Sequence, residues 1–69
     1  MYSYLIFLEL FHDNKWNRKT PILFAETKDE AVEKRGSLMS IDKEIRGSVK
    51  KRRVTLQKID TKESESVDI

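Results

Sequence analysis

The chain has 69 residues, enough for one small domain, and its composition of 38% hydrophobic and 38% charged residues is typical of a folded globular protein. It contains no cysteine and one histidine, His12, which excludes a disulfide scaffold, a thiolate metal site, a cysteine nucleophile and an imidazole metal cage, and we expect no cofactor. The net charge of +2 hides a segregation, because residues 15–19 and 49–59 carry cations without an acid, whereas acids gather in residues 26–33 and 60–68.

The first element is an apolar segment, residues 2–11, which is rich in aromatic and aliphatic side chains and lacks glycine and proline. This composition predicts a β-strand. Its most apolar part, residues 4–8, follows no basic residue, ends at Glu9 and is far shorter than the about 20 residues of a membrane span. We therefore expect no signal peptide, no membrane contact and a cytoplasmic location.

A polar loop and a second strand come next. Residues 12–19 contain the turn-forming pair Asp13 and Asn14, which predicts a hairpin loop. Residues 20–25 predict a second strand, and Pro21 near its start favours an edge position because proline has no amide hydrogen to donate.

The segment that follows predicts a helix. Thr27 and Glu30 have the spacing of a capping box, in which each side chain bonds a backbone amide of the first turn. An apolar stripe continues the helix to about Arg46, with Gly47 as its stop, and Gly36 allows a break between residues 36 and 40. The stripe consists of Ala31, Leu38, Ile41 and Ile45.

The end of the chain predicts a third strand and a tail. Residues 49–59 alternate, with Val54 and Leu56 on one face and Thr55, Gln57 and Ile59 on the other. Residues 61–69 are small, polar and acidic, which predicts a flexible tail.

This order of elements predicts a single α+β domain over residues 1–60 with ββαβ topology. A right-handed crossover through the helix places the third strand beside the first. The result is a three-stranded antiparallel sheet in the order 2-1-3, with one helix on one face.

The predicted topology brings two basic segments to the same end of the sheet, since the hairpin loop and the start of the third strand lie together. We expect a partner-binding surface there, although each of its cations could equally serve only to solvate the surface. The candidate residues are Lys15, Trp16, Arg18, Lys19, Lys50, Lys51, Arg52 and Arg53.

The first strand is apolar on both faces, so one helix cannot cover all of it. Leu5, Phe7 and Phe11 point away from the predicted helix side. They form either an apolar interface, most simply of a homodimer, or a surface covered by Trp16 or by the tail.

The sequence offers little chemistry for catalysis, and we expect a protein that is not an enzyme. His12 and Asp13 are the one adjacent histidine and carboxylate, and their place in a turn is typical of solvated residues. Nucleic-acid binding is a second interpretation, because the basic run of residues 50–53 could hold phosphates while Trp16 stacks on a base.

One stretch resembles a known family. The string Ala-Glu-Thr-Lys-Asp-Glu-Ala-Val-Glu, at residues 25–33, is similar to the strand-to-helix junction of the small inhibitor of bacterial RNA polymerase made by short-tailed coliphages. Pro21 and Ile22 precede the string here as in that family, and Arg52 and Arg53 lie in the last predicted strand. The resemblance implies a sheet-and-helix module that docks on a host polymerase, with Arg52 and Arg53 as contacting cations.

Small phage anti-defence proteins show a similar order of elements, so the resemblance extends loosely to phage inhibitors in general. Together these features predict a small phage-type regulatory protein that binds a host machine, either RNA polymerase or a defence complex. The alternatives are a nucleic-acid-binding module that uses the same cations and a structural subunit of a homo-oligomer.

Overall fold

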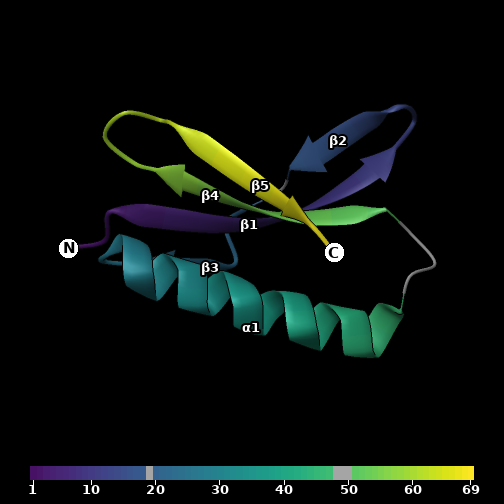
Figure 1. The fold of residues 1–69 in the computed structure, drawn as a ribbon. Helices are drawn as coiled ribbons and strands as arrows, with labels where there is room; N and C mark the ends of the chain where they lie inside the picture. Colours follow the sequence, from purple (N-terminus) through teal and green to yellow (C-terminus); the bar gives the residue numbers. More distant parts are fainter. Residues whose placement is uncertain (19, 48–50) are drawn as a thin grey trace.

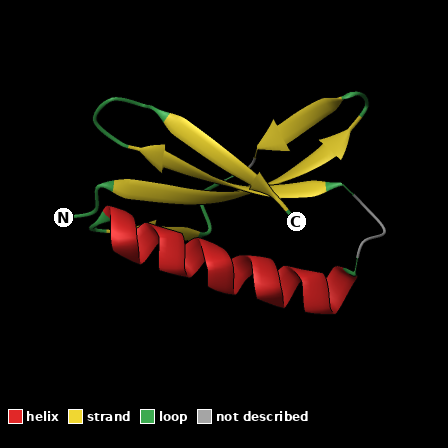
Figure 2. Ribbon diagram, viewed as in Figure 1, coloured by secondary structure: helices red, strands yellow, loops and turns green. Residues whose placement is uncertain are grey.

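The computed structural model describes residues 1–18, 20–47 and 51–69. It has one helix packed on one face of an antiparallel sheet of five strands (Figures 1 and 2). The elements are β1 (Tyr4–His12), β2 (Lys15–Arg18), β3 (Leu23–Ala25), α1 (Lys28–Arg46), β4 (Arg52–Lys58) and β5 (Ser64–Asp68). The α+β class and the single helix agree with the sequence prediction, whereas the sheet is wider than the three strands expected.

The strand order is β2-β1-β4-β5, and β3 also pairs with β1. β4 pairs with β1 from Tyr4 to Leu10 along one edge. The other edge of β1 is therefore shared, with β3 beside Tyr4 to Ile6 and β2 beside Glu9 to His12. The three predicted strands correspond to β1, β3 and β4, and β1 lies between the other two as expected.

The first additional strand arises because the hairpin after β1 is tighter than predicted. Asp13 and Asn14 both have positive φ angles, of 54° and 62°, as a two-residue type I′ turn requires. His12 and Lys15 pair directly across this turn, so residues 15–18 form β2 instead of a loop.

The second additional strand is β5, which occupies most of the segment predicted to be a flexible tail. Residues 64–68 pair antiparallel with β4, and Val67 lies opposite Val54. The side chain of Ile69 then packs against the buried core. Residues 61–69 are thus part of the sheet domain.

The helix begins and ends where the sequence predicts. The Thr27 hydroxyl accepts a hydrogen bond of 3.2 Å from the amide of Glu30, and the amide of Gly47 donates to the carbonyl of Lys43 at the far end. The Glu30 carboxylate accepts from the amide of Glu26, one residue before the expected partner. α1 runs without a break through Gly36, because tertiary packing outweighs the cost of about 1 kcal/mol of a mid-helix glycine.

The core lies between α1 and the face of the sheet that carries Ile6, Val54 and Leu56. Ala25 and Ala31 complete its fully buried part, and their small side chains let β3 and α1 approach each other. Partly buried hydrophobic side chains surround it, namely Tyr4, Leu8, Leu23, Leu38, Met39 and Ile69. No helix in the described ranges is long and apolar enough to span a membrane.

The inner face of α1 differs from the predicted stripe at its C-terminal half. Ile41 and Ile45 are 53% and 75% exposed, whereas Asp42 is buried. The Asp42 carboxylate accepts a hydrogen bond from Nε of Arg52, a residue that is also buried and that bonds the carbonyl of Gly47. An ion pair therefore occupies the place where the sequence predicted aliphatic packing.

Candidate docking site at the basic end of the sheet

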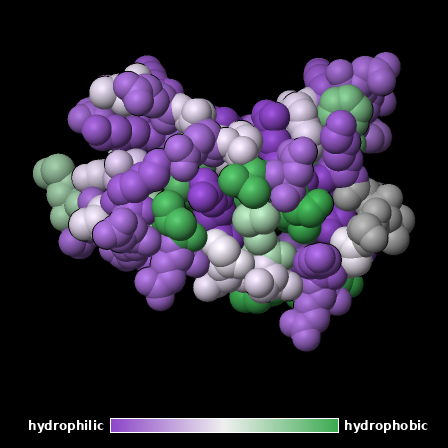
Figure 3. Space-filling view, viewed as in Figure 1, coloured by the Kyte–Doolittle hydropathy of each residue, from purple (hydrophilic) through white to green (hydrophobic). Residues whose placement is uncertain are grey.

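The face of the sheet turned away from α1, here called the open face, carries the candidate site. Side chains alternate along a strand, so Phe7, Glu9 and Phe11 point to this face while Ile6 and Leu8 point to the helix. The β1–β2 and β4–β5 hairpins diverge on this side of the molecule (Figure 1). The space-filling view shows a hollow between two hydrophilic lobes (Figure 3).

A buried carboxylate organises the open face. Glu9 is only 3% exposed, and its carboxylate accepts hydrogen bonds from Nε of Arg53 at 3.0 Å and from Nε of Arg18 at 3.2 Å. Arg18 and Arg53 flank Glu9 in register on β2 and β4, so the three residues form one row across the sheet. We call Arg18 and Arg53 the arginine pair.

Hydroxyl groups extend this network to the outer strand. The Oγ1 hydroxyl of Thr55, which is fully buried, donates its hydrogen to Glu9. Because that hydrogen is committed, the Ser66 hydroxyl must donate the bond of 2.7 Å that joins Ser66 Oγ to Thr55 Oγ1. The network therefore connects β2, β1, β4 and β5.

The surroundings of Glu9 change its acidity. Burial raises the pKa of the Glu9 carboxyl, but the hydrogen bonds from Thr55, Arg53 and Arg18 outweigh burial and hold that pKa below its ordinary value of 4.5. Glu9 is therefore ionised at neutral pH, and its negative charge fixes the arginine pair.

Beside this row lies a group of aromatic rings and cations, here called the aromatic cluster, made of Phe11, Trp16, Lys51 and Arg53. The Phe11 and Trp16 rings meet edge to face, with their centroids 5.3 Å apart. The Arg53 guanidinium carbon lies 4.2 Å from the centroid of the Trp16 ring, and Lys51 Nζ lies 5.0 Å from that of Phe11. These distances are within the range of cation–π attraction.

Trp16 and most of the predicted basic residues that the structure describes lie close together. Trp16, Arg18, Lys51 and Arg53 share the open face, and Lys15 lies on the same hairpin but points to the opposite face of β2. Lys19 and Lys50 lie outside the described residues.

Arg52 differs from the other predicted contacts that the structure describes, because it is buried. The residue is 2% exposed, and its side chain points to the core and pairs with Asp42. Arg52 is therefore not accessible to a partner. The physical reason is strand alternation, which puts Arg52 on the same side of β4 as Val54 and Leu56.

The predicted apolar interface is smaller than the sequence suggested. Phe7 is 6% exposed, because the Arg18 guanidinium lies over its ring at 4.4 Å from the centroid. Leu5 is half-buried, and Phe11 is 38% exposed within the aromatic cluster. Polar side chains of the sheet itself therefore supply part of the missing cover.

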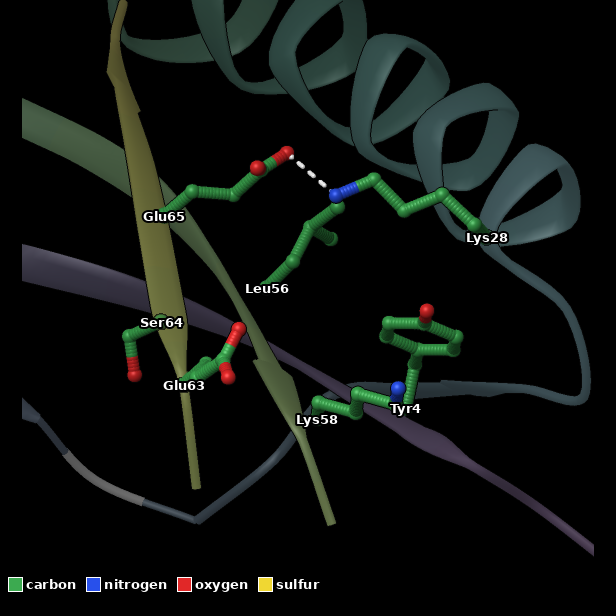
Figure 4. A pocket seen from close by; sticks show the side chains of 7 residues that line it. All are labelled: Tyr4, Lys28, Leu56, Lys58, Glu63, Ser64 and Glu65. Carbon is green, nitrogen blue, oxygen red and sulfur yellow. Dashed lines mark ion pairs between the residues drawn. The ribbon is translucent and has the colours of Figure 1, made fainter. Parts of the chain in front are cut away.

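A second hollow lies at the other end of the molecule, between the start of α1 and β5, with a volume of about 200 Å³ (Figure 4). Lys28 reaches from α1 to Glu65 on β5, with a distance of 2.9 Å between Nζ and Oε1, and Arg35 Nη1 bonds the same oxygen at 3.0 Å. These hydrogen bonds, that of Lys28 first, hold the pKa of Glu65 below its ordinary value. The arrangement ties β5 to the helix.

The described residues offer no metal centre. Among residues 1–18, 20–47 and 51–69, no group of three histidine, aspartate or glutamate side chains could hold a metal ion. His12 and Asp13 lie 3.4 Å apart at the hairpin turn with both side chains largely exposed, as expected for solvated turn residues.

Sequence reasoning missed the central residue of the site, Glu9, although a signal was present. An acid between Phe7 and Phe11 on one face of an apolar strand needs partners, and three arginines occur in the strands predicted to flank it or in the adjoining loop. Comparison of the chain with protein-family models, with curated proteins and with solved structures found no match.

Proposed function

We propose that this chain is a small non-enzymatic regulatory protein that binds a larger protein machine through the basic end of its open face. The observation that carries the proposal is the aromatic cluster, in which an exposed Phe11 and a half-buried Trp16 lie under the side chains of Lys51 and Arg53. Tryptophan, tyrosine and arginine supply a large share of the binding energy at protein interfaces.

The cations that lie against the Phe11 and Trp16 rings favour a protein partner over nucleic acid. One face of Trp16 is covered by Arg53, and Lys51 lies near both rings, at 5.0 Å from Phe11 and 5.8 Å from Trp16. Stacking on a base requires a free ring face and cations directed at the backbone phosphates. Glu9 and Asp68 also add negative charge beside Arg53, which weakens the attraction of a phosphate backbone.

The identity of the partner rests on the resemblance at residues 25–33, which implies bacterial RNA polymerase and more broadly a host complex targeted by a phage. Arg53 is the one of the two implied cations that faces solvent, since Arg52 is buried. In this proposal the protein acts in the host cytoplasm.

Binding of the purified chain to bacterial RNA polymerase by biolayer interferometry tests the proposal. We expect Trp16→Ala and Lys51→Gln each to weaken binding by about 10-fold or more, because central aromatic and cationic residues dominate interfaces. Lys43→Gln is the matched control, since it removes one exposed cation from the last turn of α1.

The same variants should be titrated with a 20-base-pair DNA duplex at several salt concentrations. Affinity for DNA that falls steeply with salt, with a slope that Lys51→Gln flattens, would favour the nucleic-acid interpretation over ours. No binding to polymerase would remove that partner and leave the docking surface to be tested against other complexes.

A further inference from the structure

The arginine pair is fixed in place, but part of each guanidinium remains unused. Arg18 donates from Nε to Glu9 and from Nη1 to Gln57, at 3.2 and 3.1 Å. Arg53 donates from Nε to Glu9 at 3.0 Å. Among the residues that the structure describes, Nη2 of Arg18 and both Nη atoms of Arg53 have no hydrogen-bond partner.

Aromatic rings hold the two guanidinium groups in position. Arg18 lies over Phe7 with its guanidinium carbon 4.4 Å from the ring centroid, and Arg53 lies over Trp16 at 4.2 Å. Their side chains are 33% and 27% exposed, so the unused nitrogens can reach a ligand. Side chains that are already fixed lose less conformational entropy on binding than free arginines.

We infer that the arginine pair is a receptor for a single phosphate monoester carried by a protein partner, an inference that rests on the proposed function and names the chemistry of the group recognised. A phosphate monoester offers three terminal oxygens, whereas a carboxylate offers two and is satisfied by one guanidinium fork. The three unused nitrogens of the pair lie on both sides of Glu9 and so suit an oxyanion that bridges the two arginines.

The charges of the open face favour one compact anion over a polyanion. Lys51 supplies a third cation beside Arg53, because both contact the Trp16 ring. Glu9 lies between the arginines, and Asp68 lies opposite Arg53 on β5. Among the described residues around Glu9, three cations and two carboxylates leave a small positive excess, which suits one phosphate group better than the many successive charges of a nucleic-acid backbone.

Fluorescence anisotropy with a labelled nine-residue peptide tests the inference. The peptide carries one phosphoserine among glycine, serine and alanine, and the matched probes replace phosphoserine by serine or by glutamate. The emission of Trp16, the one tryptophan of the chain, provides a second readout because Arg53 contacts its ring. Inorganic phosphate and a single-stranded oligonucleotide complete the set of probes.

We expect the phosphopeptide to bind and the serine peptide not to bind. Arg18→Lys and Arg53→Lys keep the charge but remove the fork, and each should weaken phosphopeptide binding by about 10-fold or more. Lys43→Gln should leave the affinity unchanged. Arg18 lies on the four-residue strand β2, so its variant keeps the test valid even if Arg53→Lys unfolds the chain.

Several outcomes would overturn the inference. Equal affinity for the glutamate and phosphoserine peptides would mean that the arginine pair recognises negative charge alone. Equal affinity for inorganic phosphate and the phosphopeptide would mean that the arginine pair binds free phosphate and not a phosphorylated protein. Tighter binding of the oligonucleotide would overturn the inference together with the proposed function. Polymerase binding that depends on Trp16 and Lys51 without any phosphopeptide binding would overturn the inference alone.

Discussion

The carboxylate of Glu9 should contribute to stability in a way that depends on pH, and Glu9→Gln tests this. Glutamine keeps one oxygen to accept from Thr55 but loses the charge that both arginines bond. A hydrogen bond to a charged group contributes about 1.5 to 3 kcal/mol when it is buried. Because the arginine side chains are 33% and 27% exposed, water replaces part of each bond.

We therefore expect Glu9→Gln to lower the free energy of unfolding by about 2 kcal/mol at pH 7. A chain of this size has a total stability of about 3 to 10 kcal/mol, so the loss is a large fraction of it. The corresponding fall in the midpoint of thermal unfolding is about 8 to 16 °C.

The pH dependence has a definite sign. The pKa of Glu9 is lower in the folded protein than its ordinary value of 4.5, so ionised Glu9 stabilises the fold above that value. The stabilisation is lost as the pH falls through the folded pKa. The difference between the natural chain and Glu9→Gln should therefore be constant from pH 7 to about 5 and should shrink at lower pH.

Urea unfolding followed by circular dichroism over this pH series measures the effect. Glu44→Gln, at an exposed position of α1, is the control and should change stability by less than about 0.5 kcal/mol. A Glu9→Gln chain as stable as the natural one at pH 7, or a difference that does not shrink in acid, would refute the reasoning.

Three further substitutions test the helix and its contact with the sheet. Asp42→Asn removes the carboxylate that pairs with buried Arg52 and should lower the free energy of unfolding by about 3 kcal/mol in urea, unlike a surface ion pair. Thr27→Ala removes the cap on the amide of Glu30 and should cost about 1 kcal/mol in thermal unfolding, a loss that Thr27→Ser should restore. Gly36→Ala should stabilise the chain by about 0.5 to 1 kcal/mol, because an added Cβ meets nothing within 4 Å, and a destabilised variant would contradict this.

The elements that the sequence predicted well are those with strong local signals. The limits of α1 follow from the cap at Thr27 and from Gly47, and β1 follows from a dense apolar segment. β5 has no such signal, since its residues are polar or acidic except Val67 and all of them are exposed. It forms because β4 offers a free edge, and pairing of this kind depends on tertiary context more than on intrinsic propensity.

The candidate site was predicted only in part, because strand register, like the pairing of β5, depends on tertiary context. The convergence of Trp16, Lys51 and Arg53 follows from topology, which the order of elements indicated. The burial of Arg52 could have been read from its alternation with Val54, because a charge on the core face needs a buried partner such as Asp42. The role of Glu9 required the register that places it between two arginines, and only the folded sheet supplies that register.

The two outer sides of the sheet discourage strand addition by other chains. On one side β2 and β3 are four and three residues long and pair with separate parts of β1, so each of these two strands offers only a short row of unpaired backbone groups. On the other side β5 carries Glu65 and Asp68, whose charges repel a second copy of the same strand. Short and charged outer strands are a common protection against aggregation, so concentrated solutions of this protein should resist fibril formation.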